Sequence, residues 1–297
     1  ESVTIPSSVT SIGDYAFYYC ESLATLNLPD GVTTIGEKAF SECRTMKSVT
    51  IPSSVTEIGL HGFAGCGEID GVYISDLSAW CKINFISPNS NPIYDAHHLY
   101  LNGSEITELT IPSDITELKN TFPYSYITSV TIPDSVTSIG DHTFSDCKYL
   151  ESVTIPEGVT EIGERAFYYC ESLATLNLPD GITKIGKQAF EFCRGLESIA
   201  LPDGVTEIGV EAFYGCIGLT TVTIPDSVTS IAGYAFSGCE KLTSVYCEPT
   251  TPPAGSEGMF PTYPSPPKIY VPTASVDAYK SAENWSRYSS DIVDYDF

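Results

Sequence analysis

Aromatic and imidazole side chains gather in one stretch of the chain and are the residues best suited to bind a ligand. Each combines a flat apolar surface with a hydrogen-bonding group, and tyrosine and tryptophan are enriched among the residues that dominate binding energy. The candidates for ligand binding are Tyr73, Trp80, Tyr94, His97, His98, Tyr100 and, later in the chain, Tyr246. The same side chains could instead cover a joint between two mismatched parts of the fold, and the sequence leaves both interpretations open.

The histidines also carry a weak signal for catalysis or metal binding. His97 and His98 follow Asp95, but neighbouring residues on a strand point to opposite faces, which makes joint binding of one ion difficult. The chain contains no G-x-S-x-G, H-E-x-x-H or phosphate-loop motif. We therefore expect a protein that is not an enzyme.

A column of acidic residues is a candidate cation site. In five consecutive repeats the residue after a proline is acidic: Asp134, Glu157, Asp180, Asp203 and Asp226. If these residues stack about 5 Å apart, neighbouring carboxylates repel by about 0.8 kcal/mol in water before salt screening. Ca²⁺ could bridge them because it prefers carboxylate oxygens. The alternative is a solvated edge of turn-favouring residues.

Most of the ten cysteines follow a fixed step of 23 residues. They are Cys20, Cys43 and Cys66, then Cys147, Cys170, Cys193, Cys216 and Cys239; Cys81 and Cys247 lie outside the series. Parallel side chains stacked about 5 Å apart lack the dihedral angle near ±90° that a disulfide requires. Zinc sites need local pairs such as C-x-x-C, which are missing. We predict a buried ladder of free thiols.

The same 23-residue step sets the spacing of other residues. Aliphatic–proline pairs recur at Ile5-Pro6, Leu28-Pro29 and Ile51-Pro52, and phenylalanines recur at Phe17, Phe40 and Phe63. A fixed period of this length indicates a solenoid and is too short for a four-stranded propeller blade. The segment Ala16–Gly31 returns unchanged as Ala166–Gly181, which indicates duplication of units.

One unit shows how the repeat folds. Val3-Thr4-Ile5 alternates like a short strand, and Pro6 ends it because proline donates no ladder hydrogen bond. A second extended piece follows at residues 9–12. Ala16, Phe17, Cys20 and Leu23 are spaced like one face of a short helix or 3₁₀ turn. A single unit cannot bury these residues, so neighbouring units must stack.

The repeated pattern Leu-x-x-Val-x-Ile-Pro-x-x-Val-x-x-Ile-Gly-x-x-Ala-Phe-x-x-Cys-x-x-Leu resembles the BspA-like (treponemal-type) leucine-rich repeat over nearly the whole chain. The resemblance implies a right-handed α/β repeat solenoid with mostly short β-strands. It also implies a bacterial protein, secreted or displayed at the cell surface, that adheres to host proteins, glycans or other surface polymers. The alternative is a structural spacer that displays another domain and has no ligand of its own.

We expect residues 1–297 to form a single solenoid of about eleven or twelve units. Residues 1–74 and 127–247 keep the period, residues 75–126 form an irregular insert, and residues 248–297 form a C-terminal cap. Insertions in solenoids lie in loops, often on the binding face.

Charge limits the choice of partners. Lys and Arg number 14 against 38 Asp and Glu, a net charge of −24, which disfavours nucleic acids and anionic membranes. No apolar run approaches the roughly 20 residues that span a bilayer, so we expect no membrane insertion by this fragment. The chain opens within a repeat, and we expect the leader and anchor of an extracellular or cell-surface protein to lie outside it.

Overall fold

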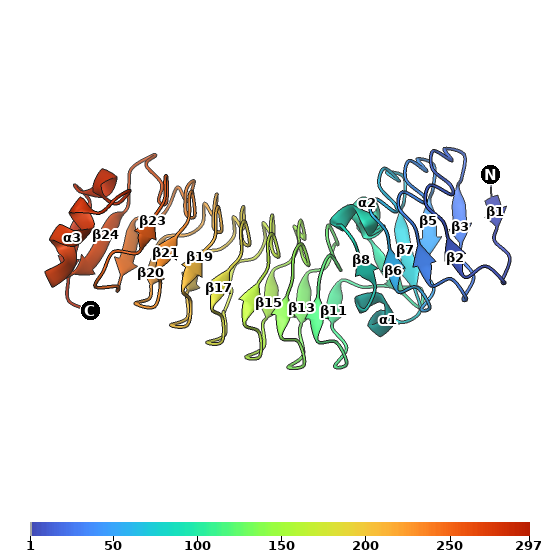
Figure 1. Cartoon of the computed structure of the whole chain (residues 1–297), viewed down its shortest axis with the longest axis horizontal. Coiled ribbons are helices and arrows are strands. Elements are labelled where there is room, and N and C mark those ends of the chain that lie inside the picture. Colours follow the sequence, from blue (N-terminus) through green and yellow to red (C-terminus); the bar gives the residue numbers. More distant parts are fainter. Residues whose placement is uncertain (1) are drawn as a thin grey trace.

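The computed structural model, which describes residues 2–297, is an elongated repeat solenoid (Figure 1). The chain makes about 13 turns stacked along one axis, more than the eleven or twelve expected. The difference arises because the C-terminal segment extends the sheet: β24 (Lys268–Pro272) pairs with β22 (Ser244–Cys247), and β25 (Ile292–Tyr295) pairs with β24.

One row of strands contributes a strand from almost every turn. Its register follows the repeat, so Val3 lies opposite Leu26 and Leu26 opposite Val49. The first sheet contains β1 (Ser2–Thr4), β3 (Thr25–Asn27), β5 (Ser48–Thr50), β7 (Gly71–Ile74), β9 (Leu99–Leu101) and β10 (Ser104–Glu105). The row resumes with β11 (Glu108–Thr110), β13 (Ser129–Thr131) and β15 (Ser152–Thr154), and then β18 (Ser198–Ala200), β20 (Thr221–Ile224), β22, β24 and β25. Pairing is parallel except between β9 and β10.

A second row of two-residue strands runs beside the first. It consists of β2 (Ser11–Ile12), β4 (Thr34–Ile35), β6 (Glu57–Ile58) and β8 (Asn84–Phe85) in one sheet. The other sheet contains β12 (Glu117–Leu118), β14 (Ser138–Ile139), β16 (Glu161–Ile162), β17 (Lys184–Ile185), β19 (Glu207–Ile208), β21 (Ser230–Ile231) and β23 (Ala254–Gly255).

The third side of each regular unit is a run of single turns rather than a continuous helix, and i→i+3 bonds such as Tyr18 N–H to Tyr15 O at 3.1 Å close these turns. Residues four apart adopt positive φ, for example Tyr15 at 57° and Tyr19 at 58°. Alternate N–H groups then bond to the next unit: Tyr15 N–H donates to Glu37 O at 2.8 Å and Phe17 N–H to Ala39 O at 2.8 Å. A helix would use these donors internally, so the turns extend the pairing between units to this side.

Helices occur in the irregular segment and at the C-terminal end. They are α1 (Leu77–Cys81), α2 (Ile93–Ala96) and α3 (Val276–Ser281), with 3₁₀ turns η1 (Pro88–Ser90), η2 (Thr273–Ser275) and η3 (Ser286–Tyr288). Among residues 2–297, none of the helices is both long and apolar enough to cross a bilayer.

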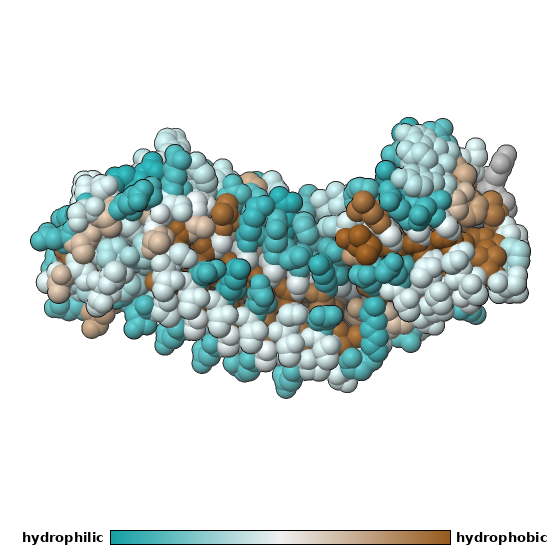
Figure 2. All heavy atoms as spheres, viewed as in Figure 1, coloured by the Kyte–Doolittle hydropathy of each residue, from teal (hydrophilic) through white to brown (hydrophobic). Residues whose placement is uncertain are grey.

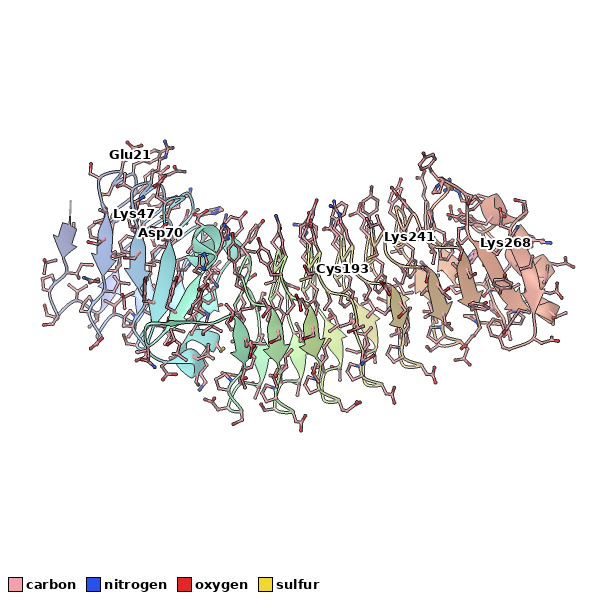
Figure 3. All side chains as sticks on the ribbon, turned by 180° about the vertical axis from the view of Figure 1, so that it is seen from behind. Glu21, Lys47, Asp70, Cys193, Lys241 and Lys268 are labelled. Atoms are coloured by element: carbon pink, nitrogen blue, oxygen red, sulfur yellow. The ribbon has the colours of Figure 1, made fainter. Side chains whose placement is uncertain are left out.

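The core is a set of ladders running along the stack. Phe17 and Phe40 stack with ring centroids 5.2 Å apart, and Phe40 repeats the contact with Phe63. Beside them, each ladder thiol from Cys43 onward donates to the carbonyl of a phenylalanine in the preceding unit, as Cys193 (labelled in Figure 3) does to Phe167 O at 3.2 Å. All ten cysteines are free and only Cys20 is exposed, which confirms the predicted ladder of free thiols. On the face shown in Figure 2, hydrophobic residues form a narrow lengthwise band between rows of hydrophilic ones.

The stack is interrupted at residues 75–126, which we call the seam. Strands β8 and β12 belong to different sheets, as do β10 and β11, and the blue N-terminal turns in Figure 1 are displaced from the line of the others. In regular units a backbone bond joins the strands at this point, for example Gly140 N–H to Leu118 O at 2.7 Å. At the seam, side chains replace it: Asn120 Nδ2 donates to Phe85 O at 2.9 Å, and Lys119 N–H donates to Thr121 Oγ1 at 3.2 Å.

We predict that the ladder thiols resist alkylation in the native protein. Burial raises the pKa of Cys43 to about 11 and those of Cys81 and Cys147 to about 12, and the thiolate is the reactive form. Intact-mass spectrometry after brief treatment with iodoacetamide should therefore show one label, on the exposed Cys20. Rapid labelling of several ladder cysteines, or a mass lowered by disulfide formation, would contradict the burial of these thiols.

We also predict that Asn120→Ala destabilises the protein by about 1–3 kcal/mol, because the buried carbonyl of Phe85 loses its donor. Chemical denaturation provides the measurement. Asn102→Ala is the matched control: Asn102 also has positive φ (50°, against 53° at Asn120) but is exposed. Equal losses in the two variants would show that backbone conformation, rather than the bond across the seam, explains the effect.

Candidate functional site

Two tyrosines stack on the strand face at the edge of the seam. The register of β7 and β9 places Tyr73 opposite Tyr100, and their rings lie 4.8 Å apart at 13°. Most regular strands carry threonine at this position, as in Thr50 and Thr131. Tyr73 remains 38% exposed, so the pair offers aromatic surface on a face that otherwise carries small side chains.

The aromatic contacts continue from this pair along the seam. His98 lies 6.4 Å from Tyr100 and 4.7 Å from Tyr126, and Tyr126 meets Tyr149 at 5.0 Å, all between ring centroids. Tyr126 and Tyr149 are 38% and 51% exposed. We call Tyr73, Tyr100, His98, Tyr126 and Tyr149 the aromatic track.

Sequence reasoning did not select the last two members of the track. Tyr126 lies in the same irregular stretch as the chosen residues, but Tyr149 lies in a regular repeat. The signal for Tyr149 is its column: equivalent positions in the other regular units hold Ser22, Thr45, Glu68, Ser172, Gly195, Gly218 and Lys241. Tyr149 is the aromatic exception in that column.

The histidine and aspartate candidates do not form a catalytic group. The Asp95 carboxylate accepts a bond from Cys66 N–H at 2.9 Å, and burial raises its pKa. His97 Nδ1 lies 3.1 Å from Tyr124 O, its ring stacks on Tyr126, and burial lowers its pKa. His98 bonds instead to Glu105. Each side chain therefore has a separate structural partner.

Trp80 was a ligand candidate, and this prediction is wrong. Its side chain is 1% exposed, and its indole N–H donates to Thr121 O at 3.3 Å across the seam. Trp80 packs against Phe85 with centroids 5.1 Å apart. The residue thus fills the core where the two blocks of repeats meet.

Tyr94 lies apart from the track, in a pocket formed by the turn segments. Its ring packs on Tyr124 at 4.3 Å, and the cavity has a volume of about 370 Å³. We call it the turn-side pocket; its other lining residues include His61, His142, Asp146, Arg165 and Tyr168. It shares no lining residue with the track.

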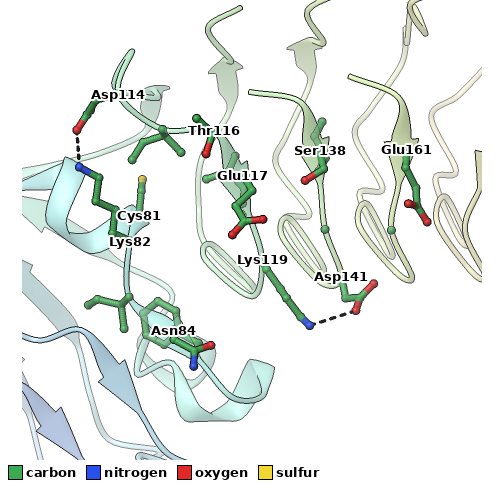
Figure 4. A pocket seen from close by; sticks show the side chains of 17 residues that line it. Cys81, Lys82, Asn84, Asp114, Thr116, Glu117, Lys119, Ser138, Asp141 and Glu161 are labelled. Carbon is green, nitrogen blue, oxygen red and sulfur yellow. Dashed lines mark hydrogen bonds and ion pairs between the residues drawn. The ribbon is translucent and has the colours of Figure 1, made fainter. Parts of the chain in front are cut away.

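The break between β8 and β12 opens as a polar cleft of about 570 Å³ (Figure 4). Its lysines are paired: Lys82 Nζ lies 2.6 Å from Asp114, and Lys119 Nζ lies 3.7 Å from Asp141. Glu117 and Glu161 also line the cleft (Figure 4). Because the lysines face carboxylates, the cleft offers little attraction to anions.

The acidic column is exposed, with one residue in each of five successive units: Asp134, Glu157, Asp180, Asp203 and Asp226. Burial and the charges of Asp203 and Asp226 raise the pKa of Glu248 beside the column. In the part of the chain that the structure describes, no three His, Cys, Asp or Glu residues are arranged to hold a metal ion. Bridging of neighbouring carboxylates by Ca²⁺ stays a prediction.

Tyr246 belongs to a second aromatic group near the C-terminal end. It stacks on Tyr270 at 4.7 Å and 13°, and Tyr295 meets both rings edge-on. The register places Tyr246 in the same column as Thr223, so the geometry repeats that of Tyr73 and Tyr100. The strand face therefore carries two tyrosine pairs with small side chains between them.

Comparisons with solved structures place the fold among bacterial proteins. A leucine-rich cell surface protein from Faecalibacterium prausnitzii is 25% identical, with a TM-score of 0.53 over 82% of this chain and 77% of that one. A leucine-rich repeat protein from Eubacterium ventriosum is 22% identical, with a TM-score of 0.55 over 80% and 76%. The pneumococcal vaccine antigen PcpA shares the fold at 15% identity, with a TM-score of 0.52 over 98% and 78%. No curated protein matches the sequence.

The repeats themselves match a known family. Residues 1–122 and 118–243 each match the BspA type leucine rich repeat region, a pattern of six repeat copies. The match covers most of the chain and agrees with the 23-residue stacking of strands, phenylalanines and thiols. The chain belongs to the family of BspA-type leucine-rich repeat proteins.

Proposed function

We propose that this chain is a binding protein of the bacterial surface or secreted fraction, and that it holds an extended partner against the aromatic track. The observation that carries the proposal is the exposure of Tyr73, Tyr126 and Tyr149 in one connected row. Tyrosine is enriched in binding hot spots, whereas serine and threonine are under-represented there. The longest row of such residues on the strand face lies at the seam, and the shorter group of Tyr246, Tyr270 and Tyr295 lies near the C-terminal end.

The stacking of Tyr73 and Tyr100 depends on a glycine, Gly71, in the neighbouring strand position. Regular strands carry serine or threonine in this column, as in Thr25 and Ser48, but β7 has Gly71 there. A Cβ atom on Gly71 would lie 2.7 Å from Cε2 of Tyr100. Glycine thus leaves room for the Tyr100 ring to lie across β7 and stack on Tyr73. A ring fixed before binding loses less entropy on contact with a partner.

The arrangement of the rings indicates the shape of the partner. Tyr73 and Tyr100 each cover one face of the other's ring, so the parts left for a ligand include their outer edges and hydroxyl groups. The track then continues through His98 to Tyr126 and Tyr149. A row of this kind suits an extended segment with many hydrogen-bonding groups, such as a host protein loop or a surface glycan.

Charge adds a preference among such partners. The net charge of −24 repels polyanions and favours neutral or basic partners. Weak contacts at the track gain strength when several copies are displayed together on a cell. A cell-surface neighbour of 25% identity supports the proposed location.

We predict that Gly71→Ala destabilises the protein by about 1–3 kcal/mol, because the added methyl group overpacks against Tyr100. In the double variant Gly71→Ala, Tyr100→Ala the clash is absent, so stability should recover beyond the sum of the single effects. Chemical denaturation of the four proteins measures this coupling. Additive losses would show that Gly71 does not make room for the ring.

The binding proposal is tested on an array of matrix proteins, mucins and glycans. We expect at least one saturable interaction, weakened by about tenfold or more when Tyr73, Tyr100 and Tyr126 are changed to alanine. The matched control changes Tyr18, Tyr234 and Tyr263, which are also exposed and lie outside the track; it should bind normally. The absence of binding across the array would favour the spacer alternative. Equal loss of binding in both variants would show that the aromatic track is not the binding site.

A further inference from the structure

We propose that the turn-side pocket is a second binding site and that it takes a neutral saccharide unit. This site is separate from the track, and nothing in the proposed function requires it. The pocket spans the seam. His61 comes from the N-terminal block, Tyr94 from α2, and His142, Asp146, Arg165 and Tyr168 from the first regular units of the second block.

The walls of the cavity include three tyrosines, Tyr94, Tyr124 and Tyr168. Tyr94 and Tyr124 pack together at 4.3 Å, and Tyr168 also lines the cavity. The Tyr168 ring is held by Arg165, whose guanidinium carbon lies 5.3 Å from the ring centroid. The apolar C–H face of a pyranose ring suits such surfaces, because cavities of this size typically combine aromatic walls with a few polar groups.

The polar groups of the pocket include both donors and acceptors. Neither imidazole, of His61 or His142, forms a hydrogen bond with another residue within 2–297. Arg165 uses Nε to donate to Gln188 Oε1 at 2.8 Å, which leaves its terminal nitrogens as donors. Asp146 accepts from Ser145 Oγ at 3.1 Å and keeps further acceptor capacity. A sugar hydroxyl both donates and accepts, so this mixture suits adjacent hydroxyls.

Charge in the pocket selects against ionic ligands. Arg165 opposes a cation, and Asp146 opposes an anion. Burial, followed by the charge of Arg165, lowers the pKa of His142, so its imidazole is neutral near pH 7. The pocket therefore has no excess of one sign to hold a carboxylate, phosphate or amine. The ligand that fits is uncharged, rich in hydroxyls and apolar on one face.

The repeats supply a direct comparison for this site. Tyr18 and Tyr168 occupy the same position in the identical segments Ala16–Gly31 and Ala166–Gly181. Tyr18 is 41% exposed and lies outside the pocket, whereas Tyr168 lines it. The difference comes from the seam, which brings Tyr94 and residues of the η1 loop into the same pocket as Tyr168. Tyr18, which has the same local sequence but lies outside the pocket, is therefore the matched control for Tyr168.

The test is binding of the full chain to neutral hexoses, N-acetylhexosamines and their oligosaccharides, with sialylated and sulfated glycans for comparison. Ligand-observed NMR at millimolar sugar and a glycan array provide the readouts. We expect neutral saccharides to bind, with affinity reduced by about tenfold in Tyr168→Ala and Asp146→Asn. Tyr18→Ala and the track variant should bind the sugar normally, and circular dichroism verifies the fold of each protein.

Three results would overturn the proposal. The first is the absence of neutral saccharide binding by the folded wild-type chain. The second is tighter binding of acidic glycans than of neutral ones. The third is equal loss in Tyr18→Ala and Tyr168→Ala. If only the track variant lost sugar binding, the sugar site would be assigned to the track and not to the pocket, which would also overturn the proposal.

Discussion

Contact between successive units is the interaction on which the rest of the structure depends. No unit can bury its own apolar residues, so each is completed by the next: Phe40 lies between Phe17 and Phe63, and the Cys66 thiol bonds to Phe40 O. Each large side chain buried in this way contributes roughly 1.5–3 kcal/mol. The turn segments also connect successive units, because their alternate N–H groups form hydrogen bonds with the following unit. Stability is therefore distributed along the stack, in nearest-neighbour steps.

Interrupting such a stack removes ladder bonds from both strand rows, and the seam compensates with side chains. Asn120 and Thr121 satisfy groups of the broken ladder, while Trp80 fills the space between the blocks. The track on the strand face, the turn-side pocket and the polar cleft all border this one irregular segment.

Much of the fold could be predicted because the 23-residue period places equivalent residues on top of each other. Val3, Leu26 and Val49 share a column for this reason, and so do the free thiols. The turn runs could not be predicted, since apolar spacing at Phe17 and Cys20 is the same for a helix and for turns with positive φ. Two further differences concern Trp80, which the sequence suggested as a ligand-binding residue, and Tyr149, which it did not. The burial of Trp80 depends on how two mismatched blocks meet, which no periodic pattern encodes, whereas Tyr149 is visible in the sequence as the aromatic exception in its column.

We propose that binding resides in the seam and not in the regular repeats. A decisive experiment replaces residues 75–131 with a copy of residues 156–200, which keeps strand phase from Ile74 to Ile132 while removing the seam. We predict a folded protein with β-rich circular dichroism and cooperative unfolding that no longer binds the partner recognised by the native chain. Full retention of binding in this seamless solenoid would contradict a binding site at the seam and assign recognition to the remaining surface, either the regular strand face or the group of Tyr246, Tyr270 and Tyr295.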